Sequence, residues 1–126
     1  MNTTSFDQLI KFGALQQDEA GYELPFSINP LHEIFKGHFP QQPVLPGVAT
    51  MEILRRALEL ATAKRMQLKQ AANIKFLGMV DPVATPDLTL SFNIAETDEG
   101  LKVRASIKVT GSEDVLYKQQ ATFHAD

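Results

Sequence analysis

The sequence has 126 residues, no cysteine and a formal net charge of −3 at pH 7. A chain of this length predicts one domain, over residues 1–126, with a single core. The missing cysteines exclude disulfides, thiol nucleophiles and cysteine metal sites, and the negative charge argues against general nucleic-acid binding. No apolar run approaches the roughly twenty residues of a membrane span, and the N-terminus lacks a secretory signal pattern, so the cytoplasm is the expected location.

The N-terminal third predicts short elements joined by turns. Ser5 can cap a short helical turn. Residues 12–17 and 22–28 have the composition of strands, and the turn between them indicates a hairpin. A second helical turn is expected over 31–35. It contains His32, which has no third ligand at metal spacing, so we expect no metal site.

A proline-rich loop over residues 36–45 leads into the longest helical pattern of the chain. Pro40, Pro43 and Pro46 fix their own φ and disfavour helix at the preceding residue, so a helix can begin only after them. The first turn of a helix presents unpaired amide N–H groups with a partial positive charge. The amide of Gly47, or that of a neighbour, is therefore a candidate to hold a carbonyl oxygen or an oxyanion.

The pattern after Val48 predicts one amphipathic helix that ends near Ala63. Its apolar positions are Met51, Leu54, Leu58 and Ala61, and its polar face carries Glu52, Arg55, Arg56 and Glu59. Two interpretations of Glu52 are open, because a helical carboxylate can pair with an arginine one turn later or can do chemistry. His38 in the loop is equally open, as a packed or capping side chain or as an acid–base group.

Strand patterns fill the chain after the helix, over 67–79, 88–94, 101–109 and 115–123. The strict alternation of apolar and polar residues in 88–94 and 101–109 is typical of strands buried on one face. Turn-forming residues separate the patterns. Consecutive hairpins predict an antiparallel sheet with one face covered by the single helix, which is the α+β class.

The loop and the helix together carry a long motif with fixed spacing. Residues 37–48 read GHFPQQPVLPGV, and Glu52 follows His38 by fourteen positions. This motif resembles the signature of the β-hydroxyacyl-acyl-carrier-protein dehydratases of the FabZ and FabA type, including the dehydratases of aryl-polyene pathways. The resemblance implies a hotdog fold, in which a curved antiparallel sheet wraps one long helix.

The resemblance also implies an activity, the dehydration of a (3R)-hydroxyacyl-[acyl-carrier-protein] thioester to the trans-2-enoyl thioester in fatty-acid or polyene-type biosynthesis. His38 is then the base, the amides of Gly47 and Val48 hold the thioester carbonyl, and Glu52 of the partner subunit donates a proton to the hydroxyl or holds the water that does. The expected walls of the substrate tunnel are Phe39, Pro40, Val44, Leu45 and Pro46.

The family carries its substrate on the phosphopantetheine of an acyl carrier protein and needs no metal or other cofactor. Its members are homodimers or larger assemblies, such as a dimer of dimers or a trimer of dimers. Residues 34–75 of this chain are basic, which fits a landing surface for an acidic carrier or, alternatively, a solvated helix face. The expected docking residues are Lys36, Arg55, Arg56, Lys64 and Arg65.

One departure from the family pattern concerns Arg56, which stands where these enzymes usually carry glutamine. An arginine one turn from Glu52 should lower the pKa of that carboxyl and hold it ionised, unless burial counteracts. We expect Arg56 and His32 to lie just behind the catalytic groups. Two other functions remain open: a hotdog thioesterase, which directs water at the thioester carbonyl, and a non-catalytic hotdog subunit that binds an acyl carrier or a paired dehydratase.

Overall fold

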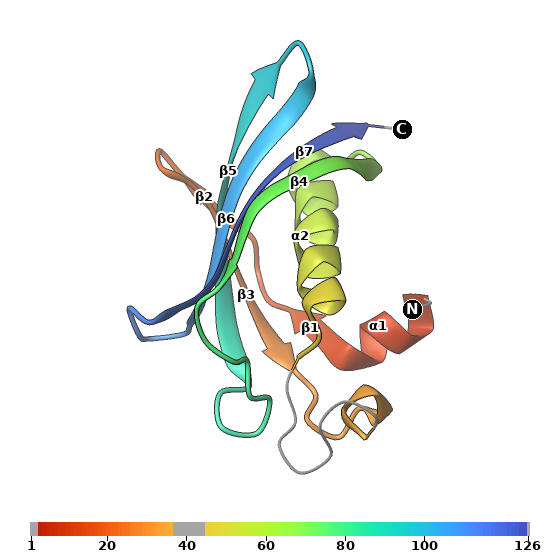
Figure 1. Ribbon diagram of the computed structural model, residues 1–126, viewed down its shortest axis with the longest axis vertical. Coiled ribbons are helices and arrows are strands. Elements are labelled where there is room, and N and C mark those ends of the chain that lie inside the picture. Colours follow the sequence, from red (N-terminus) through yellow and green to blue (C-terminus); the bar gives the residue numbers. More distant parts are fainter. Residues whose placement is uncertain (1–2, 37–44, 126) are drawn as a thin grey trace.

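A computed structural model describes residues 3–36 and 45–125 and shows a curved antiparallel sheet wrapped around one long helix, α2 (Figure 1). The elements in chain order are α1 Thr3–Leu9, β1 Ile10–Phe12, β2 Gln16–Asp18, β3 Gly21–Ile28, the 3₁₀ helix η1 Glu33–Phe35, α2 Gly47–Thr62, β4 Met66–Phe76, β5 Asp87–Thr97, β6 Gly100–Val109 and β7 Val115–Ala125. The predicted α+β class and hotdog arrangement are confirmed.

The sheet has the strand order β1-β3-β5-β6-β7-β4, with β2 also paired to β3, and every pair is antiparallel. The predicted hairpins β5–β6 and β6–β7 are present. The prediction of consecutive hairpins throughout is wrong for β4, which pairs with β7 at the far edge and not with β5. Turn residues specify that a chain reverses but not which strand it joins. Residues 77–86 carry the chain from the edge strand β4 to β5, which lies inside the sheet between β3 and β6.

The predicted strand over 12–17 is in fact two short strands. Phe12 of β1 pairs with Phe26, and Gln16 of β2 pairs with Glu23. The three residues 13–15 therefore lie opposite only two residues of β3, 24 and 25. Pro25 of β3 lies at this break and has no N–H to donate to a partner strand. Its carbonyl accepts from the amide of Gly13 at 2.7 Å, which holds the irregular segment against β3.

Helix α2 lies in the concave face of the sheet, and its buried stripe differs from the predicted one. Its buried residues are Ala49, Thr50, Ile53, Leu54, Ala57 and Leu58. Met51 and Ala61, predicted to be core, are only half-buried, and Leu60 is exposed. A sheet that curves around a helix covers a wide arc of its surface, so small residues next to the predicted stripe are also enclosed. The helix ends as predicted at Ala63, which adopts a left-handed conformation and donates its amide to the carbonyl of Glu59.

Strand β4 is an exposed apolar edge of the sheet. It pairs with β7 on one side and has no strand partner on the other within the described part of the chain. Large apolar side chains are exposed along it and just after it: Leu68, Ile74, Phe76, Leu77 and Met79. An unpaired strand edge offers backbone N–H and C=O groups to another chain, so β4 combines two features of an assembly surface.

Candidate active site

Helix α2 begins at Gly47, directly after the prolines, and the oxyanion role of its first amides stays a prediction. Pro46 is the extended residue before the helix, and its carbonyl accepts from the amides of Ala49 and Thr50 at 3.0 and 3.3 Å. The amides of Gly47 and Val48 precede these two in the chain, in the turn where helical partners are lacking. A Cβ on Gly47 would lie 3.0 Å from Cζ of Phe76, so the ring at the end of β4 packs against the helix start.

The predicted histidine and much of the predicted tunnel, namely His38, Phe39, Pro40 and Val44, lie outside the described residues, so their roles stay predictions. The two remaining tunnel positions lie at the helix start. Leu45 is buried and donates its amide to the carbonyl of Val80 at 3.0 Å, and Pro46 is half-buried. The end of the loop is therefore tied to the segment that follows β4.

His32 is a buried capping residue. Its Nδ1 accepts a hydrogen bond from the amide of Ile34 at 3.0 Å, and only 7% of the residue is exposed. This interaction begins η1, directly before the proline-rich loop. Its role behind the catalytic groups stays a prediction. No group of three potential metal ligands occurs among the described residues.

Glu52 is held by two arginines of its own helix. Nε and Nη2 of Arg55 donate to its two carboxylate oxygens at 2.7 and 2.8 Å, and Nε of Arg56 donates to Oε2 at 3.0 Å. Hydrogen bonds from Arg55 first, and then from Arg56, hold the pKa of Glu52 below its ordinary value, although partial burial acts in the opposite direction. The sequence predicted the ion pair between Glu52 and Arg56 but not the bidentate pair between Glu52 and Arg55. The spacing of three residues between Glu52 and Arg55 could have indicated it.

Both arginines are also bound to other parts of the chain. Arg55 donates from Nη1 to Glu59 at 2.8 Å and to the carbonyl of Met66 at 3.3 Å. The guanidinium of Arg56 lies 4.2 Å from the ring centre of Phe6 and bonds Asp7 at 3.3 Å. These side chains are therefore engaged within the chain itself.

Of the predicted docking residues, Lys36, Lys64 and Arg65 are exposed. Arg55 and Arg56 are bound within the chain and are not free side chains on a solvated face. Carrier docking stays a prediction, now concentrated on these three cations.

The ion pairs have an expected titration behaviour. Replacing Arg55 with Gln should raise the pKa of Glu52, and Arg56→Gln should raise it less, because Arg55 supplies the larger share of the lowering. A carbon-detected NMR titration of the labelled carboxyl would measure both shifts, with Arg65→Gln as the charge-matched control. Because the folded-state pKa is lowered, the pairs stabilise the fold above about pH 4.5 and this contribution is lost as pH falls through the lowered value. An unmoved Glu52 titration in Arg55→Gln would contradict this assignment.

An apolar cavity of about 360 Å³ opens beside this network, and we call it the Glu52 cavity. It is lined by Phe6, Val48, Met51, Glu52, Arg55, Leu68, Gln119 and Phe123. The lining comes from α1, the first half of α2, β4 and β7, so the cavity forms only when the sheet closes over the helix. A pocket with apolar walls and a few polar groups is typical of small-molecule sites.

Sequence reasoning missed Gln119 as a member of this site. Residues Tyr117, Ala121 and Phe123 of β7 are buried on the face that meets α2, and Gln119 occupies the same register with only 2% of its surface exposed. A polar residue at an inward position of an alternating strand was the available signal.

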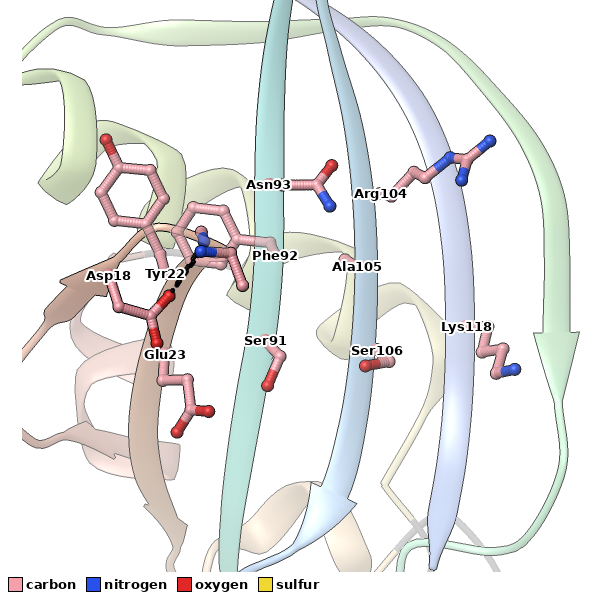
Figure 2. A pocket seen from close by; sticks show the side chains of 12 residues that line it. Asp18, Tyr22, Glu23, Ser91, Phe92, Asn93, Arg104, Ala105, Ser106 and Lys118 are labelled. Atoms are coloured by element: carbon pink, nitrogen blue, oxygen red, sulfur yellow. Dashed lines mark hydrogen bonds between the residues drawn. The ribbon is translucent and has the colours of Figure 1, made fainter. Parts of the chain in front are cut away.

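A second hollow, of about 260 Å³, lies on the outer face of the sheet and has a different character. Figure 2 shows side chains of β3, β5, β6 and β7 across it, including Glu23, Ser91, Ser106 and Lys118. Its Asp18 carboxylate accepts from the amides of Ala20 and Gly21 and so closes the β2–β3 turn. Among the described residues, Glu52 is the predicted catalytic side chain, and it lines the Glu52 cavity and not this hollow, so the Glu52 cavity is the better candidate site.

Comparison with known proteins decides the family. The profile of the ApeI-like family, described as ApeI dehydratase, matches residues 14–114, which is more than half of the chain. The chain belongs to the ApeI-like dehydratase family. It is also 40% identical over 45 residues to the 3-hydroxyacyl-[acyl-carrier-protein] dehydratase FabZ of Haemophilus influenzae strain PittEE. That stretch covers 36% of this chain and only 30% of the relative.

Solved structures agree with the fold. The chain is similar to the dehydratase heterocomplex ApeI:P of Xenorhabdus doucetiae, with a TM-score of 0.70 and 21% identity over 90% of this chain and 96% of that one. It is also similar to yhdA of Lactococcus lactis, named as a candidate thioesterase, with a TM-score of 0.67 and 13% identity over 99% and 97% of the two chains. At such identities the likeness establishes the hotdog fold alone. In the described part of the ApeI-like chain, no helix is long and apolar enough to span a membrane.

Proposed function

We propose that this ApeI-like chain dehydrates a 3-hydroxyacyl thioester to the trans-2-enoyl thioester. The observation that carries the proposal is the placement of Glu52, which lines an apolar cavity beside the first turns of α2. Family membership supports dehydration over the other reactions that hotdog folds perform. The helix start adds the amides of Gly47 and Val48, which suit a thioester oxygen that gains charge during the reaction.

Dehydration breaks the C2–H and C3–O bonds and forms the C2–C3 double bond with release of water. In the proposed reaction His38 takes the proton from C2, and the amides at the helix start stabilise negative charge on the thioester oxygen. The electron pair left at C2 becomes the double bond as the hydroxyl departs. The proton taken by His38 is then available to convert the leaving hydroxide to water.

The structure favours one of the two roles expected for Glu52. A carboxyl held ionised by Arg55 and Arg56 is a poor proton donor, whereas it accepts hydrogen bonds well. We therefore propose that Glu52 orients the substrate hydroxyl, or a water beside it, as an acceptor. This role is compatible with an arginine at position 56, where the family usually has glutamine, because it does not require burial to raise the pKa of Glu52.

The proposed substrate is carried on the phosphopantetheine of an acyl carrier protein, and the proposed assembly contains at least two hotdog chains. Exposed Lys36, Lys64 and Arg65 suit the acidic surface of a carrier. The unpaired apolar edge at β4 suits a partner chain, either a second copy or a paired subunit. The second possibility is favoured by the Xenorhabdus doucetiae relative, which is a dehydratase heterocomplex.

The test is a parallel assay on 3-hydroxyacyl carrier protein and on a 3-hydroxyacyl pantetheine. Absorbance of the enoyl thioester and release of free thiol are recorded from the same sample. We expect enoyl formation without thiol release. Thiol release alone would indicate a thioesterase. Enoyl formation that needs a paired dehydratase and is unchanged when His38→Ala replaces the wild-type chain would indicate a non-catalytic subunit.

A further inference from the structure

Gln119 lines the Glu52 cavity and carries a buried hydrogen-bond donor that no described residue uses. Its Oε1 accepts from the hydroxyl of Tyr117 at 2.5 Å, and its Nε2 is buried without a hydrogen-bond partner among the described residues. Both residues are 2% exposed. Buried polar side chains almost always have partners, so this amide stands out within the core.

The neighbouring phenol is bonded to the oxygen end of this amide. Burial raises the pKa of Tyr117 to about 12, so the phenol keeps the proton that it donates to the amide oxygen. The NH₂ end of Gln119 is left as the end without a partner. A buried donor in this state is unfavourable in the empty protein, and a ligand that brings an acceptor removes the penalty.

The opposite kind of group lines the same cavity. Two carboxylate oxygens can accept about four hydrogen bonds, and the arginines use three of these positions on Glu52. Two residues that line one apolar cavity, one with an acceptor position left and one with an unpartnered donor, match a ligand group that both donates and accepts. A hydroxyl does both, whereas a hydrocarbon chain or an alkene does neither.

We propose that Gln119 is the residue that recognises the 3-hydroxyl of the substrate, with its Nε2 donating to the hydroxyl oxygen while the hydroxyl donates to Glu52. The inference rests on the proposed function and names the feature by which that site selects its substrate. The saturated acyl chain and the enoyl product lack the hydroxyl and leave both groups without their ligand partner. The same contact therefore separates substrate from product.

The experiment measures binding, not turnover. Stable amide analogues of a 3-hydroxyacyl pantetheine and of the matching saturated acyl pantetheine are titrated into the wild-type protein and into Gln119→Met. The wild type should prefer the hydroxylated analogue, and Gln119→Met should reduce that preference by about tenfold, the effect of one hydrogen bond. Gln120→Met, on the other face of the same strand, is the matched control and should keep the preference.

A double variant guards against damage to the fold. Gln119→Met leaves the phenol of Tyr117 without its partner, whereas Tyr117→Phe with Gln119→Met removes both polar groups. The double variant should keep the wild-type urea midpoint or exceed it and still lose the preference. A preference that survives in either Gln119 variant, or that is absent from the wild type, overturns the inference. Failure of the proposed function appears separately, as absence of enoyl product in the wild-type assay.

Discussion

The variant His38→Ala should lower the rate of enoyl formation by about 10²–10⁴-fold, the usual contribution of a positioned acid–base group. An imidazole is the one side chain whose ordinary pKa lies near neutral pH. Much of it is therefore neutral at that pH and able to accept a proton from C2. The reason for choosing this histidine is its place in the GHFP motif before α2. Steady-state rates with the hydroxyacyl pantetheine substrate would measure the loss.

The control for this variant is His124→Ala. His124 lies near the end of β7, is exposed and contacts Gln67 on the neighbouring strand β4. It should keep wild-type turnover. If His38→Ala also turned over within a few-fold of wild type, the histidine would have no catalytic role.

The second large effect is expected from Glu52→Gln, which should lower enoyl formation by about 10²-fold, the loss expected when one preorganised hydrogen-bonding group is removed from a site. The change keeps the shape of the side chain but removes the charge that accepts the substrate hydroxyl. It also leaves Arg55 and Arg56 facing a neutral amide, which weakens their attraction to this position.

Glu59→Gln separates chemistry from helix stability. Glu59 is the other carboxylate that binds Arg55, one turn from Arg56 in the same helix, and it does not line the Glu52 cavity. The two variants make the same change of charge. Glu52→Gln weakens two hydrogen bonds from Arg55 and one from Arg56, whereas Glu59→Gln weakens one from Arg55 and one from the amide of Met66. Glu59→Gln should also lower the urea midpoint, yet keep most of the activity. Equal losses of activity would mean that Glu52 serves the ion-pair network alone.

Secondary structure was largely predictable, because each element depends on neighbours in the sequence. Pro46 and Gly47 set the start of α2, and Ala63 ends it near the predicted position. The alternating patterns of β5 and β6 are likewise local features, since one face of each strand is buried. The family motif spans the same short stretch, which is why the dehydratase assignment could be made before the structure.

The sequence by itself thus determined the elements, the class and the motif at the helix start, whereas the tertiary structure decided which strands and side chains meet. The pairing of β4 with β7 depends on a connection that crosses the sheet, and no local signal names the partner. Gln119 lies far from Glu52 in the chain and joins its cavity only because β7 folds over α2. Contacts between distant segments are chosen by the burial of the whole core, and a local pattern carries no information about them.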